Sequence, residues 1–177
     1  MRFDLTTFTF LHVALSLVGI IAGLVAVGGL VAGRRLDGWT GTFLATTFLT
    51  NLTGFGFPFV KFLPSHGVGI VSVVLLPAVA YALYLKRLEG TWRRVYVAGA
   101  VTALYLNVFV LVAQLFHRVP ALIVLAPKQQ EPPFLLAQLL TLALFIGLGR
   151  AAWRGFAHEP AASLNPRTDR GVAPRPA

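Results

Sequence analysis

The sequence predicts an all-α integral membrane protein, a helical bundle with five transmembrane helices. Of its 177 residues, 56% are hydrophobic and only 12% are charged, whereas a soluble domain carries about a quarter charged residues. The apolar residues also come in runs long enough to cross a bilayer core, which takes roughly 20 residues of helix. We therefore assign residues 1–157 to one bundle and residues 158–177, rich in Pro, Ala and Arg, to a disordered cytoplasmic tail.

The five helices are predicted at about 7–32, 41–59, 66–85, 95–116 and 134–149. In the first helix, Gly19 and Gly23 form a small-xxx-small pair, which lets a neighbouring helix approach closely. The second helix carries Thr47 and Asn51 on one face. Polar groups at membrane depth need partners, so we expect the other helices to pack around the polar stretch 42–69.

The third, fourth and fifth predicted helices include one interruption by prolines. The third is predicted to begin at about His66 with Ser65 as its N-cap, and the fourth carries Asn107 and Gln114 on one face at helical spacing. Residues 119–133 contain several prolines and cannot continue as one straight helix, so this segment is predicted to lie along the interface or to re-enter the protein. The fifth helix, as predicted, is short for a membrane span.

The distribution of positive charge predicts the orientation. Eleven Lys and Arg residues fall in the first-to-second and third-to-fourth connections and in the C-terminal segment, and four fall on the opposite side. Because cytoplasmic loops carry an excess of Lys and Arg, we expect the N-terminus outside and the C-terminus in the cytoplasm. The same pattern assigns the net charge of +9 to membrane topology and lipid headgroups, and not to nucleic-acid binding.

Three histidines are predicted to reach the outer side of the membrane, namely His12, His66 and His117. Three imidazoles at one depth could bind a transition metal, and two could clamp the iron of haem b. Polar groups at this depth could also hold a quinone headgroup. In the simpler interpretation, water and headgroups satisfy His66 and His117 at their helix ends, and His12 forms a hydrogen bond to a Thr or Asn.

Further polar residues are candidates for lining a pocket on the outer side: Asn51, Asn107, Gln114, Gln130 and Glu131. We favour interhelical hydrogen bonds for the membrane-embedded amides over a substrate path. All acidic residues lie outside the predicted spans, which argues against an ion-coupled transporter. The chain has no cysteine, and it lacks the nucleophile elbow, zinc-protease and P-loop motifs of common enzymes.

Five segments carry a resemblance to other proteins: Thr53–Phe59, Pro64–Ser72, Trp92–Val97, Leu104–Gln114 and Val119–Phe134. They resemble a family of small, uncharacterised bacterial multi-pass inner-membrane proteins to which no activity is assigned. The resemblance covers about residues 8–154 and implies a bacterial inner-membrane location without a mechanism. It singles out Asn107, Gln114, Gln130, Glu131 and His66, and it implies that His117 stands where a lysine is typical. That would leave His12 and His66 as the only histidine pair.

The sequence therefore favours a non-enzymatic membrane subunit or assembly partner, with the lipid bilayer and other membrane-protein subunits as its partners. The glycine face of the first helix and the proline-rich outer loop would dock other proteins. The alternative is a redox membrane protein that binds haem b or a quinone through His12 and His66, with His117 as an optional third residue.

Overall fold

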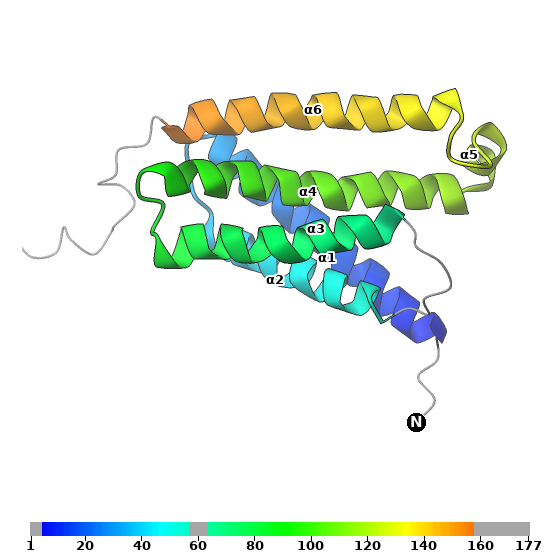
Figure 1. Cartoon of the computed structure of the whole chain (residues 1–177), viewed down its shortest axis with the longest axis horizontal. Helices are drawn as coiled ribbons and strands as arrows, with labels where there is room; N and C mark the ends of the chain where they lie inside the picture. Colours follow the sequence, from blue (N-terminus) through cyan, green and yellow to red (C-terminus); the bar gives the residue numbers. More distant parts are fainter. Residues whose placement is uncertain (1–4, 57–63, 158–177) are drawn as a thin grey trace, which may run out of the picture.

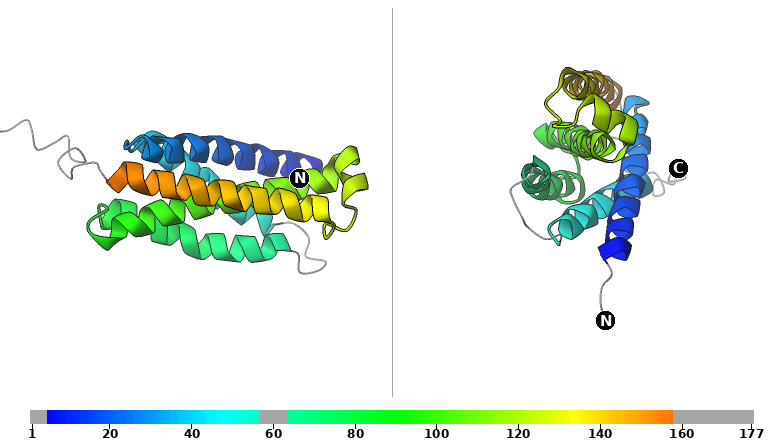
Figure 2. Two further views of the ribbon diagram at one scale, coloured as in Figure 1. Left: turned by 90° about the horizontal axis from the view of Figure 1, so that it is seen from above. Right: turned by 90° about the vertical axis from the view of Figure 1, so that its right-hand side faces the viewer.

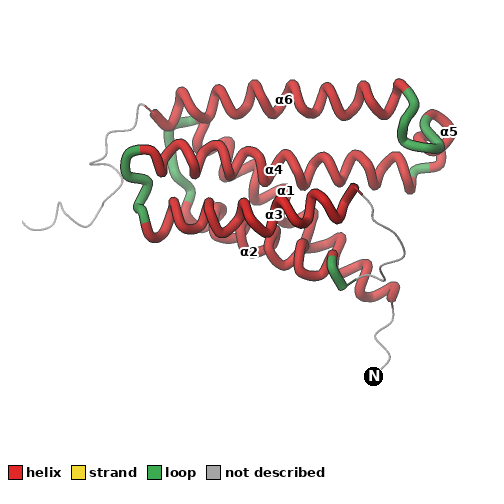
Figure 3. Tube along the Cα trace, viewed as in Figure 1, coloured by secondary structure: helices red, strands yellow, loops and turns green. Residues whose placement is uncertain are grey.

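The computed structural model describes residues 5–56 and 64–157, and over these residues it is an all-helical bundle without strands (Figures 1 and 3). The elements are α1 (Leu5–Val31), α2 (Asp37–Gly54), α3 (Pro64–Ala80), the π-helix η1 (Tyr81–Leu85), α4 (Thr91–Arg118), α5 (Pro120–Leu125) and α6 (Pro132–Ala157). The all-α prediction is confirmed. The segment predicted as interfacial or re-entrant contains the short helix α5, and the predicted tail lies outside the described residues.

Four helical segments are long and apolar enough to cross a membrane, which supports a multi-pass membrane protein. They are Thr6–Val31, Gly67–Leu85, Thr91–Arg118 and Pro132–Phe156. Helix α2, with 18 residues, is not among them, because its threonines and Asn51 lower its apolarity. At 1.5 Å per residue, α2 would still extend about 27 Å, close to the roughly 30 Å of a hydrocarbon core.

The long helices run alternately, so the connections lie at two ends of the bundle (Figures 1 and 2). The α1–α2 connection, the η1–α4 connection and the end of α6 share one end, whereas the end of α2, α5 and the start of α6 lie at the other. We call the first the basic end, because it holds Arg34, Arg35, Lys86, Arg87, Arg93, Arg94, Arg150 and Arg154. We call the other the α5 end; its described cations are Arg118 and Lys128.

Tryptophans accompany the arginines at the basic end. Trp39 lies in the first turn of α2, Trp92 in the first turn of α4, and Trp153 in the last turns of α6. Amphipathic aromatic rings gather at the level of lipid headgroups. The tryptophans and arginines together therefore have the composition of a membrane interface.

Helix α4, and not α2, is the central helix of the bundle. It packs against α1, α3 and α6, and along its length Ala100, Ala103 and Leu104 are buried. The expectation that the other helices surround the stretch 42–69 is wrong, because α2 packs mainly against α1 and, less extensively, α3. Residues 57–63 of that stretch lie outside the described residues.

The hydroxyl groups of α2 explain why its polarity does not make it central. Thr42 donates to Gly38 O at 2.9 Å, Thr46 to Thr42 O at 2.7 Å, and Thr53 to Leu49 O at 2.8 Å. A threonine that donates to the carbonyl four residues earlier satisfies its own hydroxyl within its helix. Three of the six threonines of α2 therefore satisfy their hydroxyl hydrogens without a neighbouring helix.

Small residues set the closest helix contacts, as predicted for Gly19 and Gly23. A methyl group on Gly19 would lie 3.0 Å from Thr46 Oγ1 of α2, and one on Gly23 would lie 2.7 Å from Leu104 Cδ1 of α4 and 2.8 Å from Phe43 Cδ2 of α2. Both glycines are thus packed inside the bundle, so the expectation that the glycine face of the first helix docks other proteins is wrong. At the basic end, a methyl group on Gly155 of α6 would lie 2.2 Å from Val31 O of α1. Backbones approach this closely only where side chains are absent.

The end of α1 that meets Gly155 is closed by a Schellman motif. Gly33 has a φ of +70°. Its N–H donates to Leu30 O at 3.1 Å, and the next N–H, of Arg34, donates to Gly29 O at 2.8 Å. Glycine tolerates this left-handed conformation without steric cost, so the chain can turn sharply toward α2.

Candidate functional site

One buried hydrogen bond joins α2 to α4 near the middle of the bundle. Asn107 Nδ2 donates to Thr47 Oγ1 at 3.0 Å. Thr47 is fully buried, and Asn107 is 9% exposed. Of the two interpretations offered for Asn107, the structure therefore describes an interhelical hydrogen bond.

The amides of Asn51 and Gln138 are also used within the bundle. Asn51 Nδ2 donates to Thr47 O at 2.8 Å, within its own helix, and Gln138 Nε2 on α6 donates to Phe109 O on α4 at 3.2 Å. Gln138 Oε1 is buried and accepts no hydrogen bond from the described residues.

His12 lies on α1 beside the end of α2. Its Nδ1 is 2.9 Å from Thr53 Oγ1, and its ring also contacts Gly54, where an added methyl group would lie 3.5 Å from Cε1. Thr53 also donates within α2, with Leu49 O at 2.8 Å and Thr50 O at 3.1 Å. Because the hydroxyl hydrogen is used there, Thr53 Oγ1 can accept a hydrogen bond from the His12 tautomer that carries hydrogen on Nδ1.

The other two predicted histidines lie on different elements. His117 is exposed in the last turn of α4. His66 lies in the first turn of α3, where the structure describes its backbone. Helices α1 and α4 are in contact where Gly23 meets Leu104, and their ends diverge toward the α5 end (Figure 1). Among the described residues, no group of three or more His, Asp or Glu side chains could hold a metal ion. Haem or quinone binding through His12 and His66 stays a prediction.

The motif residues near α5 form a structured connection. Glu131 carboxylate oxygens accept the backbone N–H groups of Lys128 at 3.1 Å and of Gln130 at 3.0 Å, and Gln129 Nε2 donates to Ala113 O of α4 at 2.7 Å. Partial desolvation acts to raise the pKa of Glu131, but these N–H groups and the Lys128 charge outweigh it and lower the pKa.

Glu131 also begins α6 through its backbone. Its carbonyl accepts the N–H groups of Phe134 at 3.1 Å and Leu135 at 3.2 Å. Pro132 and Pro133 occupy the first helical positions, where no N–H is needed. The side chains of Gln114 and Gln130, also predicted as pocket residues, are exposed. In this structure, the Gln-Gln-Glu-Pro-Pro run therefore acts as a helix start.

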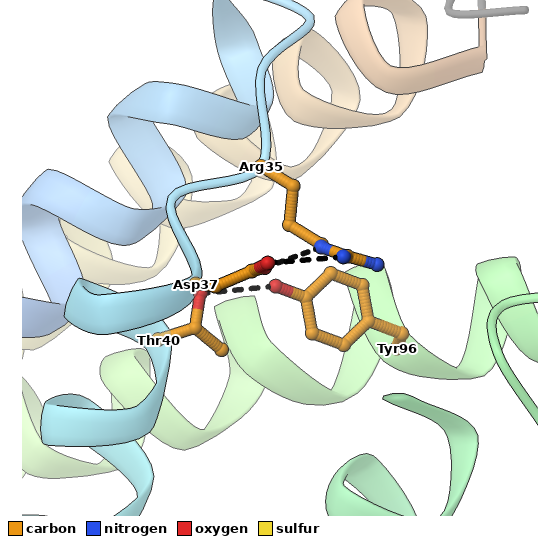
Figure 4. Close-up of polar contacts among 4 residues, drawn as sticks. All are labelled: Arg35, Asp37, Thr40 and Tyr96. Carbon is orange, nitrogen blue, oxygen red and sulfur yellow. Dashed lines mark hydrogen bonds and ion pairs between the residues drawn. The ribbon is translucent and has the colours of Figure 1, made fainter. Parts of the chain in front are cut away.

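A second α2–α4 contact lies at the basic end (Figure 4). The buried hydroxyls of Thr40 and Tyr96 are 3.3 Å apart. Beside them, Arg35 forms an ion pair with Asp37, in which Arg35 Nη2 donates to Asp37 Oδ2 at 3.1 Å. The ion pair joins the α1–α2 connection to the first turn of α2, where a carboxylate also favours the helix dipole.

A groove runs between α4 and α6 at the basic end and has a volume of about 840 Å³. Its cationic residues are Arg94, Arg150 and Arg154. Its remaining lining is largely apolar and consists of Val97, Ala98, Val101, Thr102 and Tyr105 of α4 and Leu142, Phe145, Ile146, Gly149 and Trp153 of α6. Sequence reasoning used these arginines only to orient the chain, because it could not tell that α4 and α6 are neighbours.

Two contacts that involve aromatic rings lie within the lining of this groove. The Tyr105 and Phe145 rings meet edge to face, with centroids 5.7 Å apart, at the end toward the middle of the bundle. At the basic end, Arg94 Cζ lies 5.4 Å from the Trp153 ring centroid. This cation–π contact directs the Arg94 guanidinium toward α6.

No protein-family model, curated protein or solved structure matches this chain. The resemblance to small bacterial inner-membrane proteins therefore stays a prediction.

Proposed function

We propose that this chain is a non-enzymatic subunit or assembly partner of a bacterial inner-membrane complex. In this proposal it crosses the membrane five times, with α2 as the fifth span, and its basic end faces the cytoplasm. The excess of Lys and Arg at that end supports the orientation. Helix α2 supports five spans because it runs beside α1 along most of its length.

The observation that carries the proposed role is the use of the embedded polar groups. Thr47 with Asn107, His12 with Thr53, and Gln138 with Phe109 O join helices to one another. Catalytic or transport sites need polar groups that converge on a ligand. Polar groups that form hydrogen bonds between helices instead stabilise the bundle, and its outer faces can then contact other proteins.

Helix α6 offers the most surface for such contacts. Only 17% of the most apolar 18-residue stretch of α6 is buried within the bundle, against 39% of the corresponding stretch of α4. Its exposed side chains include Leu135, Leu136, Leu139, Leu140 and Leu144. In an isolated protein this face is covered by lipid, and in a complex it is available to a neighbouring helix.

Purification of the full chain in a mild detergent tests this role. We expect a native gel to show a defined assembly larger than the chain with its micelle, and the same assembly should be recovered when the chain is tagged at either terminus. Leu139→Arg on the exposed face of α6 should dissociate this assembly, whereas Leu49→Arg on the exposed face of α2 should leave it intact. A chain that stays monomeric in native membranes, as judged by crosslinking, would contradict the proposal.

A second candidate function rests on His12. Its hydrogen bond to Thr53 orients the ring, as partner groups orient histidines that hold a metal or haem iron. An absorbance spectrum separates the two functions. A Soret band that is lost in both His12→Ala and His66→Ala variants would establish haem binding, and a colourless, metal-free protein would remove the haem and metal branch.

A further inference from the structure

We propose that the groove between α4 and α6 binds an anionic phospholipid, with an acyl chain along its apolar walls and the phosphate at Arg94 and Arg150. The proposal needs only that the bundle lies in a bilayer. It does not depend on the subunit role or on which side of the membrane the basic end faces.

The length of the groove matches one leaflet of a bilayer. On α4 the apolar lining runs from Val97 to Tyr105, and on α6 from Leu142 to Trp153. At 1.5 Å per residue these stretches are about 12 Å and about 17 Å long, and half of a hydrocarbon core is about 15 Å. The apolar walls therefore extend over the depth that one acyl chain occupies, and the Tyr105–Phe145 contact lies in the part of the groove nearest the middle of the bundle.

The charge of the groove is complementary to a phosphate at the headgroup level. Three guanidinium groups lie at its basic end, and none of the described residues that line it is acidic. Arginine presents N–H donors in a fork that matches phosphate oxygens. Basic pockets between transmembrane helices bind the headgroups of acidic lipids in this manner.

The small side chains in the walls leave the space that a chain would fill. A methyl group on Gly149 would lie 3.5 Å from Val101 Cγ1, so α4 and α6 are close to each other at this point of the groove. Ala98 lines the groove and is exposed. A large side chain at position 98 would therefore occupy the groove without entering the core.

Native mass spectrometry of the full chain in detergent micelles tests the site. The probes are phosphatidylglycerol and phosphatidylcholine with the same acyl chains, and inorganic phosphate. We expect preferential binding of phosphatidylglycerol, which excess inorganic phosphate does not displace. The double variant Arg94→Gln, Arg150→Gln should bind it about 30-fold more weakly, since each cation near a membrane surface contributes about a fivefold gain.

Matched variants separate the groove from general surface charge. Arg34→Gln, Arg87→Gln removes the same charge at the same end outside the groove and should change binding less than about twofold. Ala98→Phe should weaken lipid binding without any charge change, whereas Ala45→Phe, on the exposed face of α2, should not. Circular dichroism checks that each variant is folded.

Three results would overturn the proposal. Equal binding of the two lipids would remove the role of the arginines, and equal loss in the two double variants would reduce it to general surface charge. Displacement by inorganic phosphate would indicate a simple anion site. If the assembly tested above exists but lipid selectivity does not, only the lipid proposal fails; the converse result removes only the subunit role.

Discussion

Asn107 and Thr47 show how a polar pair is used at the scale of single residues. Both were predicted to face the interior, because amides and hydroxyls at membrane depth need partners. The sequence could not identify the partner, since Thr47 and Asn107 are 60 residues apart. The two side chains meet because α2 and α4 both pack against α1 and α3.

A double-mutant cycle on Thr47→Val and Asn107→Leu measures this hydrogen bond. Each single variant should lower the free energy of unfolding by about 1–3 kcal/mol, because its former partner is left buried and unpaired. The coupling energy should be about 0.6–1.7 kcal/mol. Unfolding in mixed micelles, followed by circular dichroism, gives these values. The control pair Thr47→Val and Gln138→Leu should be additive, and additivity of the first pair would contradict the contact.

The contribution of Glu131 to the stability of the protein should depend on pH. Its pKa in the folded protein is lowered by the N–H groups that it accepts. Its contribution to stability is therefore present above the unfolded-state pKa of about 4.3 and is lost as the pH falls through the lower folded-state value. The unfolding free-energy difference between the native chain and Glu131→Gln should shrink from pH 6 to pH 3. A difference that is constant over this range would contradict the assignment.

At the scale of elements, hydropathy located every long helix but misplaced several ends. Helix α6 was predicted at 134–149 and extends from Pro132 to Ala157. The two prolines were treated as breakers, although they are tolerated in a first turn. Arg150 and Arg154 were treated as an end, although their side chains can reach an interface while the helix continues. Hydropathy locates the apolar part of a helix, whereas the backbone hydrogen bonds of the helix can continue beyond it.

The contact between the ends of α1 and α6 is the closest described for a glycine, and it was not predicted. Gly155→Ala should destabilise the protein by about 1–3 kcal/mol, because the methyl group would lie 2.2 Å from Val31 O and the helices must separate. Gly147→Ala, in the same helix, meets nothing within 4 Å. It should leave stability unchanged or raise it by up to about 1 kcal/mol. Equal effects of the two variants would contradict the packing.

At the scale of the whole molecule, the sequence predicted the wrong central helix for an identifiable reason. The polar residues of α2 suggested a need for partners, but several of its threonines donate to their own backbone. Helix α4 is central because Gly99, Ala100 and Ala103 let neighbours approach. The α4–α6 groove was missed for a related reason, since it exists only where two helices that are distant in sequence lie side by side.

We propose that the bundle spans the membrane with its basic end in the cytoplasm, and labelling of single cysteines tests this orientation directly. The chain has no cysteine, so single cysteines at Arg34, Glu89 and Lys128 can each be probed in intact cells with a membrane-impermeant maleimide. We predict labelling of Lys128→Cys at the α5 end and protection of Arg34→Cys and Glu89→Cys at the basic end, with all three labelled after permeabilisation. Protection of Lys128→Cys together with labelling of the other two in intact cells would contradict the account.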